Sequence, residues 1–542
     1  MLLHCRIPAI VKMKNVKLNN LMSGLLLALA STGPMYAGNS ENTRMNTAAS
    51  QQISGTLPVL YINVYKADGT LDNEVTDRNL GHKNYFSGRY WLDLNGCQWL
   101  ADLGAESIGS ESEPLPLEIK ARGNYTRQAF AKKPFKLKLG SKQKLLGLSQ
   151  SKHFALLAHA DDNFGYLRNF TGFNLGRRIG LPWTPDQQPV EVVINGDYRG
   201  LYFLTESIRI EKDRIDIAEL DDNVSDPELV SGGYLVELDN YDEDNQIRMD
   251  EKSCVANQWL DRLRVTWDTP EKYSELQRRF VTDQFTAMND FVGANSDQLW
   301  SYMDLDDAAR YYVVEEIMSH TESYHGSTYL FRDRGEGQKW HFSPLWDFGN
   351  GFNGSTDRFL YDCDPFGNTW IPSMRANATF NAKVRDTWMW FMNTGYDGII
   401  EDMDTYVAHI AKAAKADRRR WKDAPRPDYN GAQDVADNSD MASRRDKAVN
   451  HLNAKVEWLK SQFGDFTSVS NPSEPARDTT PAAPLPDYAK GDGSSILLPV
   501  TDPDDDTPAT FYNLQGIRVD SPRKGSVYIM VKGNKSIRFI AK

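Results

Sequence analysis

The chain has 542 residues, which at ~150 residues for an ordinary domain corresponds to three or four structural units. Hydrophobic residues make up 40% and charged residues 25% of it, values typical of globular proteins, so a wholly disordered chain is excluded. The 62 basic and 74 acidic residues give a net charge of −12, which argues against a general binder of nucleic acid or of anionic membranes.

The first 37 residues are predicted to form a secretory signal peptide, with Met13 as an alternative start. Lys14 and Lys17 precede an apolar stretch, and Ala37 supplies the small residue of a cleavage site. That stretch is too short for a comfortable membrane span, and no later one reaches ~18 apolar residues, so no transmembrane helix is expected in the mature chain. The signal predicts a secreted, cell-surface or periplasmic protein. The polar residues 38–55 are expected to form a flexible leader.

Strand patterns dominate the next part of the chain. Apolar runs predict strands at residues 59–64, 90–94, 117–121 and 233–238, and a hairpin of strands 189–194 and 201–205 joined by Asn195-Gly196-Asp197. Helical periodicity follows at residues 271–320 and 380–463. This order of sheet and then helix predicts an α+β fold rather than a doubly wound sheet.

The C-terminal part changes composition twice. Residues 470–510 hold eight of the 25 prolines and eight acidic against two basic residues, which predicts an extended, solvated linker over residues 469–510. Residues 511–542 carry seven basic residues and one Asp, and their apolar runs predict a small β unit. The segment beginning Tyr512-Asn513-Leu514 resembles C-terminal tails of exported Bacteroidetes proteins, some of which direct secretion. A sorting signal that engages the secretion machinery and a β module without that role both remain open.

Four motifs carry the candidate chemistry. They are Arg122-Gly123-Asn124 with the lysine-rich residues 132–139, Leu156-Leu157-Ala158-His159-Ala160-Asp161-Asp162-Asn163 with Leu167-Arg168-Asn169, the hairpin at 192–206, and Pro344-Leu345-Trp346-Asp347-Phe348-Gly349. Lys136 and Lys138 alternate along one strand face, which suits either a phosphate-bearing ligand or a solvated edge strand.

In this order, the motifs resemble the CotH kinase family, named for a bacterial spore-coat protein kinase. The match covers about residues 117–350, and the helices to about 463 continue it more loosely. The strand patterns predict a β-rich region at 56–116. The resemblance implies that an atypical protein-kinase-like domain with a C-terminal helical part follows at 117–468. It further implies transfer of phosphate from ATP, with Mg²⁺ or Mn²⁺, to Ser or Thr of an exported protein.

The resemblance also implies roles for single residues. Asp347, in an Asp-Phe-Gly sequence, is the expected metal ligand and part of the catalytic machinery. Lys136 or Lys138 is expected to contact the nucleotide phosphates, and Glu206 to orient that lysine by an ion pair, although a solvated strand end explains Glu206 equally well.

Supporting roles fall to four further residues. The guanidinium groups of Arg122 and Arg168 are expected to donate paired hydrogen bonds, either to a phosphate group or to other parts of the protein. Asp162 either supports the site or caps the helix that contains Arg168 and Asn169.

One segment departs from the family pattern. Where the family has Asn and Asp, this chain has His320 and Glu322. Glu322 is the candidate catalytic carboxylate, one methylene longer than Asp, and His320 is a candidate metal ligand that favours softer ions than Mg²⁺. A misplacement of ~1 Å can cost on the order of a hundredfold in rate. An inactive kinase-like module that binds a protein or glycan, and a metal-dependent hydrolase, therefore remain alternatives.

Three other patterns are interpreted as structural. Gly349 to Gly354 matches a phosphate-loop spacing but opens no helix, so a turn-rich loop is expected. His320 and His325 are five residues apart, not the four of a zinc-hydrolase helix. The aromatic residues at 388–391 have helical spacing, which favours core packing over sugar binding.

Overall fold

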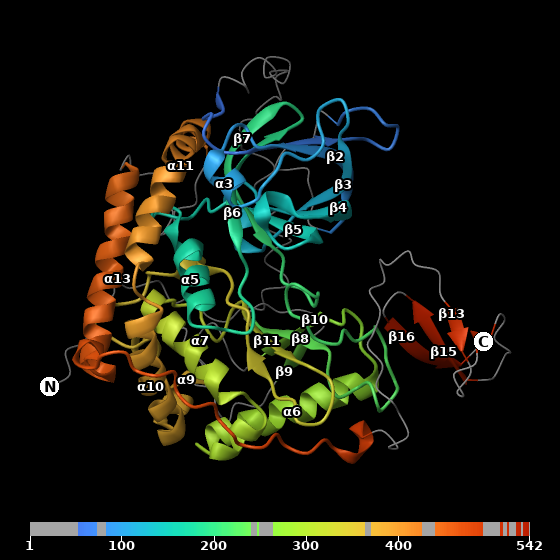
Figure 1. Ribbon diagram of the computed structural model, residues 1–542, viewed down its shortest axis with the longest axis vertical. Coiled ribbons are helices and arrows are strands. Elements are labelled where there is room, and N and C mark those ends of the chain that lie inside the picture. Colours follow the sequence, from blue (N-terminus) through green and yellow to red (C-terminus); the bar gives the residue numbers. More distant parts are fainter. Residues whose placement is uncertain are drawn as a thin grey trace, which may run out of the picture. The chain divides into compact units, whose positions relative to one another are not determined.

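The computed structural model describes most of the chain. The described residues are 52–72, 83–239, 246–248, 264–363, 370–424, 440–490, 510–512, 518–519, 527–532 and 535–540. The predicted signal peptide, most of the predicted leader and residues 491–509 of the predicted linker lie outside them. Helices and sheets are both present, which confirms the α+β prediction (Figure 1).

The first part of the chain forms a closed seven-stranded barrel. Its strands are β1 (Val59–Val64), β2 (Phe86–Asp93), β3 (Leu115–Ala121), β4 (Phe135–Gln143), β5 (Ser151–Leu157), β6 (Gln187–Ile194) and β7 (Asp197–Glu206). They follow the order β1-β2-β3-β4-β5-β7-β6, with antiparallel neighbours except for the parallel pair β1–β6 that closes the barrel. Alternate side chains point inward and form the core, as Leu137 and Leu139 do on β4. The β6–β7 hairpin confirms the predicted turn.

The barrel changes two predicted boundaries. The division between residues 116 and 117 falls inside β3, because the barrel closes only when β1 pairs with β6. The end of the predicted leader is fixed: the backbone N–H and hydroxyl of Ser54 both donate to the buried Glu191 carboxylate on β6, at 3.0 and 2.6 Å.

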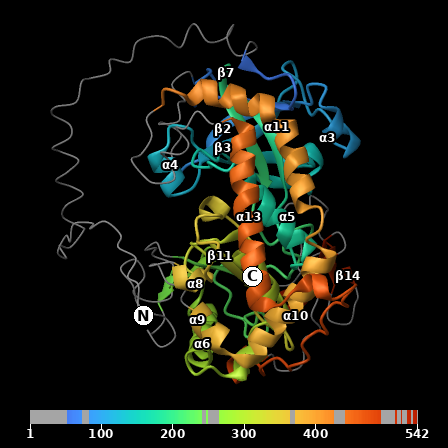
Figure 2. The same cartoon turned by 90° about the vertical axis from the view of Figure 1, so that its left-hand side faces the viewer.

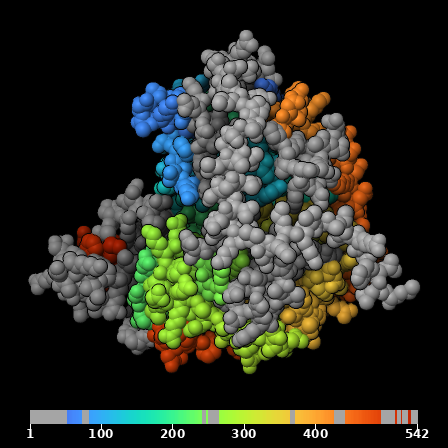
Figure 3. Space-filling model, turned by 180° about the vertical axis from the view of Figure 1, so that it is seen from behind, coloured from blue at the N-terminus to red at the C-terminus, as the bar shows by residue number. Residues whose placement is uncertain are grey.

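A second, five-stranded antiparallel sheet follows. Its strands are β8 (Tyr234–Leu238), β9 (Gln246–Arg248), β10 (Arg264–Thr269), β11 (Thr328–Arg332) and β12 (His341–Phe342), in the order β12-β11-β8-β10-β9. Helix α6 (Glu275–Gly293) begins at a capping box between Ser274 and Gln277 and packs Phe280 beneath this sheet. The colour of the α6 residues appears on the surface in the lower half of Figure 3.

The remaining helices form the predicted helical part. The long ones are α5 (Leu167–Arg178), α7 (Leu305–Met318), α10 (Ala378–Thr394), α11 (Ile399–Trp421) and α13 (Met441–Phe463), and the short ones are α3 (Gln98–Asp102), α4 (Tyr125–Ala129), α8 (Leu360–Cys363) and α9 (Ile371–Ala376). Helices α11 and α13 lie side by side (Figure 2). The Trp388 side chain is fully buried, as expected for core packing.

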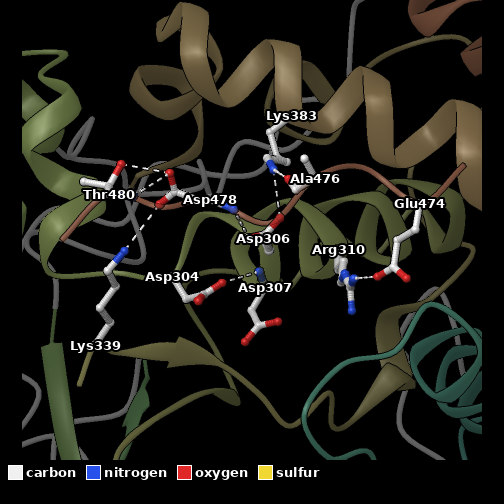
Figure 4. Close-up of polar contacts among 10 residues, drawn as sticks. All are labelled: Asp304, Asp306, Asp307, Arg310, Lys339, Lys383, Glu474, Ala476, Asp478 and Thr480. Atoms are coloured by element: carbon white, nitrogen blue, oxygen red, sulfur yellow. Dashed lines mark hydrogen bonds and ion pairs between the residues drawn. The ribbon is translucent and has the colours of Figure 1, made fainter. Parts of the chain in front are cut away.

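Parts of the first half of the predicted linker pack against the folded protein, although many of its residues are exposed. We call residues 470–490 the strap, because they run in extended form along the helical part (Figure 4). The backbone N–H of Asp478 donates to Asp306 Oδ2 at 2.7 Å, and Lys383 bridges Asp306 Oδ1 and the carbonyl of Ala476 at 2.8 and 2.7 Å. Glu474 pairs with the buried Arg310. Proline favours the extended backbone of the strap, and the contacts of Glu474, Ala476 and Asp478 attach it to the protein.

The C-terminal residues confirm the predicted β unit. Strands β13 (Thr510–Tyr512), β14 (Arg518–Val519), β15 (Val527–Lys532) and β16 (Lys535–Ile540) form an antiparallel sheet in the order β14-β13-β15-β16. Within the stretches that the structure describes, no helix combines the length and apolar character needed to cross a membrane.

Candidate functional site

A cavity of about 980 Å³ opens between one end of the barrel and the second sheet. Its walls come from the segments that follow β3 and β5, from β8 and β10, and from the loops before β11 and after β12. Arg122, Asn169, Glu322 and Asp347, all predicted site residues, line it together with Asp161. The volume accommodates a nucleotide-sized ligand.

Two carboxylates converge over Gly349. A Cβ atom at Gly349 would lie 3.3 Å from Asp347 Oδ1 and 3.4 Å from Asp161 Oδ2, so glycine leaves space between them. Asp347 itself has a φ of 53°, and the following Phe348 is fully buried. A Cβ at Gly172 of α5 would lie 2.2 Å from the Phe348 ring, so this glycine makes the slot that anchors the Asp347 loop.

The site carries an excess of negative charge. Burial, together with the charge of Asp347, raises the pKa of Glu322 to about 7. Burial raises the pKa of Asp161 to about 6, where Asp347 adds to the effect and Arg168 opposes it. The Asn350 amide donates to Glu322 Oε2 at 2.6 Å and fixes that side chain. The Asp161 and Asp347 carboxylates, which meet over Gly349, suit an oxygen-preferring divalent cation.

Backbone strain accumulates around the cavity. His159, Tyr324, Ser327, Asp347 and Phe352 all have positive φ, between 43° and 68°. Such conformations are unfavourable for residues with a Cβ and persist where packing and hydrogen bonds enforce them. Most of these residues line the cavity, which supports its assignment as the functional site.

The supporting residues hold the cavity loops. The Arg168 guanidinium donates to the Gly349 carbonyl and to Asn353 Oδ1, both at 2.7 Å. Its role is therefore structural, because it holds the loop that contains these two residues. The predicted helix cap is wrong: Asp162 Oδ1 accepts from the backbone N–H of Phe164 at 2.7 Å and therefore caps the turn before α5. Asn169 Oδ1 is buried and has no hydrogen-bond partner among the described residues.

Two predicted nucleotide contacts lie elsewhere. Lys138 forms an exposed ion pair with Glu118 at 3.1 Å, two residues farther along β4 than Lys136. Glu206 accepts from the backbone N–H groups of Ser149 and Asp186 at 2.8 and 3.0 Å, and within the described part of the chain it pairs with neither strand lysine. The geometry therefore corrects the expectation that Glu206 orients a lysine.

Lys136 lies beside the cavity wall rather than on the lining. Burial lowers its pKa, nearby Asp268 of the cavity wall opposes that change, and Arg122 and Lys120 reinforce it. The strand face that carries Lys136 is thus a cationic surface next to the acidic cavity.

His320 also stays behind the cavity wall. Its Nδ1 atom lies 2.7 Å from Glu315 Oε2, with both side chains buried, and its ring packs against Phe348 at 5.0 Å. Burial lowers the pKa of His320, but the charge and hydrogen bond of Glu315 outweigh this and raise it overall. The structure gives His320 a supporting position, in contrast to the liganding position expected from the sequence.

Asp161 is the site residue that the sequence interpretation missed. It stands beside Asp162 in the quoted motif, and no spacing rule distinguishes the two. The structure distinguishes them because the Asp162 carboxylate accepts the hydrogen bond of the turn, whereas Asp161 lines the cavity.

A second group of possible metal ligands lies at the start of α7. Ligand atoms of Asp304, Asp307 and His341 lie within 4.8 Å of one another. Asp304 caps α7 by accepting from the Asp307 N–H at 2.9 Å, and Asp307 Oδ2 lies 2.7 Å from His341 Nδ1. These interactions explain the cluster without an ion. Figure 4 shows Asp304 and Asp307 beside the strap contacts.

Comparison with known proteins identifies the family. No curated protein matched the chain. A family model described as "CotH kinase protein" matches residues 119–460, more than half of the 542 residues and all of the cavity-lining segments. The chain therefore belongs to the CotH kinase family.

Proposed function

We propose that this protein is an ATP-dependent protein kinase that phosphorylates Ser or Thr hydroxyls of an exported protein. The observation that carries the proposal is the convergence of Asp161, Glu322 and Asp347 in a cavity of about 980 Å³ that also exposes Arg122. Phosphoryl transfer requires metal ligands, cations for the phosphates and a carboxylate near the acceptor, and the cavity offers all three.

The metal ligands are the oxygen donors at the cavity floor. Asp161 and Asp347 would hold Mg²⁺ or Mn²⁺, and the buried Oδ1 of Asn169, which lacks a partner among the described residues, is a fitting neutral ligand. When bound, the metal neutralises charge on the nucleotide phosphates. His320 supports this arrangement through Glu315 and Phe348 without being a ligand.

The cationic residues would act on the nucleotide, and the general base would act on the acceptor hydroxyl. Arg122 and the neighbouring Lys136 would neutralise the nucleotide phosphates. Glu322 would accept the acceptor proton: the hydroxyl oxygen bonds to the γ-phosphorus, the bond from that phosphorus to the ADP oxygen breaks, and the proton moves to Glu322. A pKa of about 7 is well matched to this role near neutral pH.

The location proposed for this activity is outside the cytoplasm or at the cell surface. It rests on the predicted signal peptide at residues 1–37, and the β unit at 511–542 is the candidate contact for the secretion machinery. Detection of the mature chain only in the cytoplasmic fraction of its native cells would contradict this part.

The test is transfer of labelled phosphate from γ-labelled ATP to a panel of Ser/Thr peptides with Mg²⁺ or Mn²⁺. Glu322→Gln should lower the transfer rate by about 10²–10⁴-fold while nucleotide binding persists, since a general base contributes that much. Asp386→Ala, on the exposed face of α10, is the control and should match the wild type. Metal-dependent nucleotide binding without transfer in any of these conditions would instead favour the inactive binding module.

A further inference from the structure

Asp417 of α11 connects three segments beside the cavity. Its Oδ1 atom accepts from Lys132 Nζ at 2.9 Å and from the backbone N–H of Leu201 on β7 at 3.0 Å. Its Oδ2 atom accepts from the Tyr166 hydroxyl at 3.0 Å. The Asp417 and Lys132 side chains are only 7% and 4% exposed. Both oxygens of a buried carboxylate are therefore committed to fixed partners.

Glycine in the β6–β7 hairpin motif makes this contact possible. Gly200 has a φ of 96°, and a Cβ there would lie 2.0 Å from Asp417 Oδ1. The Trp421 indole N–H donates to the Arg199 carbonyl at 2.9 Å, and Arg420 Nε donates to the Tyr198 carbonyl at 2.8 Å. The end of α11 is thus fixed to the backbone of β7, beside which it lies in Figure 1.

Tyr166 transmits this contact to the cavity. It ends the turn that begins at Asp161 and has a φ of 63°. Asp162 Oδ1 accepts from the backbone N–H groups of Phe164 and Tyr166, at 2.7 and 3.2 Å, so the turn is closed internally. Its anchor to α11 is the hydroxyl bond from Tyr166 to Asp417. Arg168 Nη1, which also donates to the Gly349 carbonyl, lies 3.5 Å from the Asp161 carbonyl, and Arg444 Nη1 lies 3.5 Å from the Asp162 carbonyl. The Tyr166 hydroxyl is therefore one of the contacts that contribute to the location of Asp161.

The positive charge of Lys132 compensates the negative charge of the buried Asp417 carboxylate. Burial lowers the pKa of Lys132, and the charge of Asp417 opposes this. A buried carboxylate without such a partner is strongly destabilising. Lys132 does not line the cavity, so its role is to hold Asp417.

We propose that Asp417, paired with Lys132, is a positioning residue of the phosphoryl-transfer site, because it holds Tyr166 and thereby helps to set the location of Asp161. The inference rests on the proposed function and names a residue about 250 positions away from Asp161 in the sequence. Groups that orient a metal ligand typically contribute about 10–100-fold to metal affinity.

The test is Mn²⁺ binding to the full mature chain, measured from the electron paramagnetic resonance signal of free Mn²⁺. Tyr166→Phe removes only the hydroxyl anchor and should weaken Mn²⁺ binding by about tenfold or more. The matched control is Tyr234→Phe, a fully buried tyrosine of β8 whose hydroxyl donates to the Val230 carbonyl at 2.7 Å. It should affect the unfolding temperature as much as Tyr166→Phe does and leave Mn²⁺ affinity unchanged.

A second variant separates the loss of the Tyr166 anchor from destabilisation of the fold by an unpaired buried charge. The double substitution Lys132→Met/Asp417→Leu removes both buried charges together with the acceptor of the Tyr166 hydroxyl, and it should weaken Mn²⁺ binding as Tyr166→Phe does. Wild-type affinity in the folded Tyr166→Phe variant, within a factor of about two, would overturn the positioning role. Absence of Asp347-dependent Mn²⁺ binding in the wild type would overturn the proposed function itself, and the positioning role with it.

Discussion

Asp161, Glu322 and Asp347 line one cavity, in which the charge of Asp347 raises the cost of ionising Asp161 and Glu322. The pKa values of about 6 for Asp161 and about 7 for Glu322 follow from burial and from the charge of Asp347. A protein gains nothing in stability from such a cluster. Its presence, next to strained backbone, is typical of a site kept for chemistry.

The cluster predicts a distinctive pH dependence. The folded pKa values of Asp161 and Glu322 lie above the ordinary values of 3.8 and 4.5, so the unfolded chain releases these protons first as pH rises. The free energy of unfolding of the metal-free protein should therefore fall from about pH 4 to about pH 7 because of these groups. Added Mn²⁺ should offset the loss, more at high than at low pH.

Chemical denaturation at several pH values, with and without Mn²⁺, measures this effect. Asp347→Ala removes the shared charge, so the variant should lose less stability than the wild type over the same pH range. Identical pH profiles for the two proteins would show that the carboxylates are not coupled.

At the scale of elements, α7 is fixed at both ends. The strap binds its first two turns through Asp306 and Arg310, and its last turn carries Glu316, which forms a fully buried ion pair with Lys455 of α13 at 2.9 Å. The segment with Glu322 follows that turn directly. The strap is therefore attached to the folded domain through these contacts.

Removal of the strap should destabilise the domain. Truncation after Ser468 leaves the buried Arg310 and Asp306 without strap partners, and each unsatisfied buried group costs about 1–3 kcal/mol. Truncation after Lys490 keeps those contacts and is the control. The measurement is the free energy of unfolding of the two truncated proteins. Equal values would mean that the strap contacts do not contribute to stability.

The sequence was a good guide to local elements and a poor guide to long-range pairing. Strand 59–64 and the 195–197 turn follow from apolar patterns and turn residues that act locally. Strands β10 and β11 were missed because they are short, contain polar residues and pair with β8, far away in sequence. The same contrast between local patterns and long-range contacts holds for the site residues. The predicted site residues Asp347 and Glu322 line the cavity, whereas Glu206 and His320 have backbone or carboxylate partners that no motif reveals.

At the scale of the whole folded domain, the cavity depends on how the barrel meets the helical part. The barrel supplies Arg122 and the Asp161 turn, whereas the helical part and second sheet supply Glu322 and Asp347. Helix α11 fixes the two together through Asp417 and the backbone of β7. Catalytic groups from both sides can then hold a nucleotide between them, as the proposed kinase activity requires.

The most direct test of this account is thermal unfolding of the full mature chain with ATP and Mg²⁺ or Mn²⁺, beside Asp347→Ala and the control Asp386→Ala. Ligand at a hundred times its dissociation constant should stabilise the wild type and the control by about 2.7 kcal/mol, and this gain should require metal and be lost in Asp347→Ala. No shift with any combination of nucleotide and metal would contradict the nucleotide site and leave a CotH-family fold with another use for its cavity.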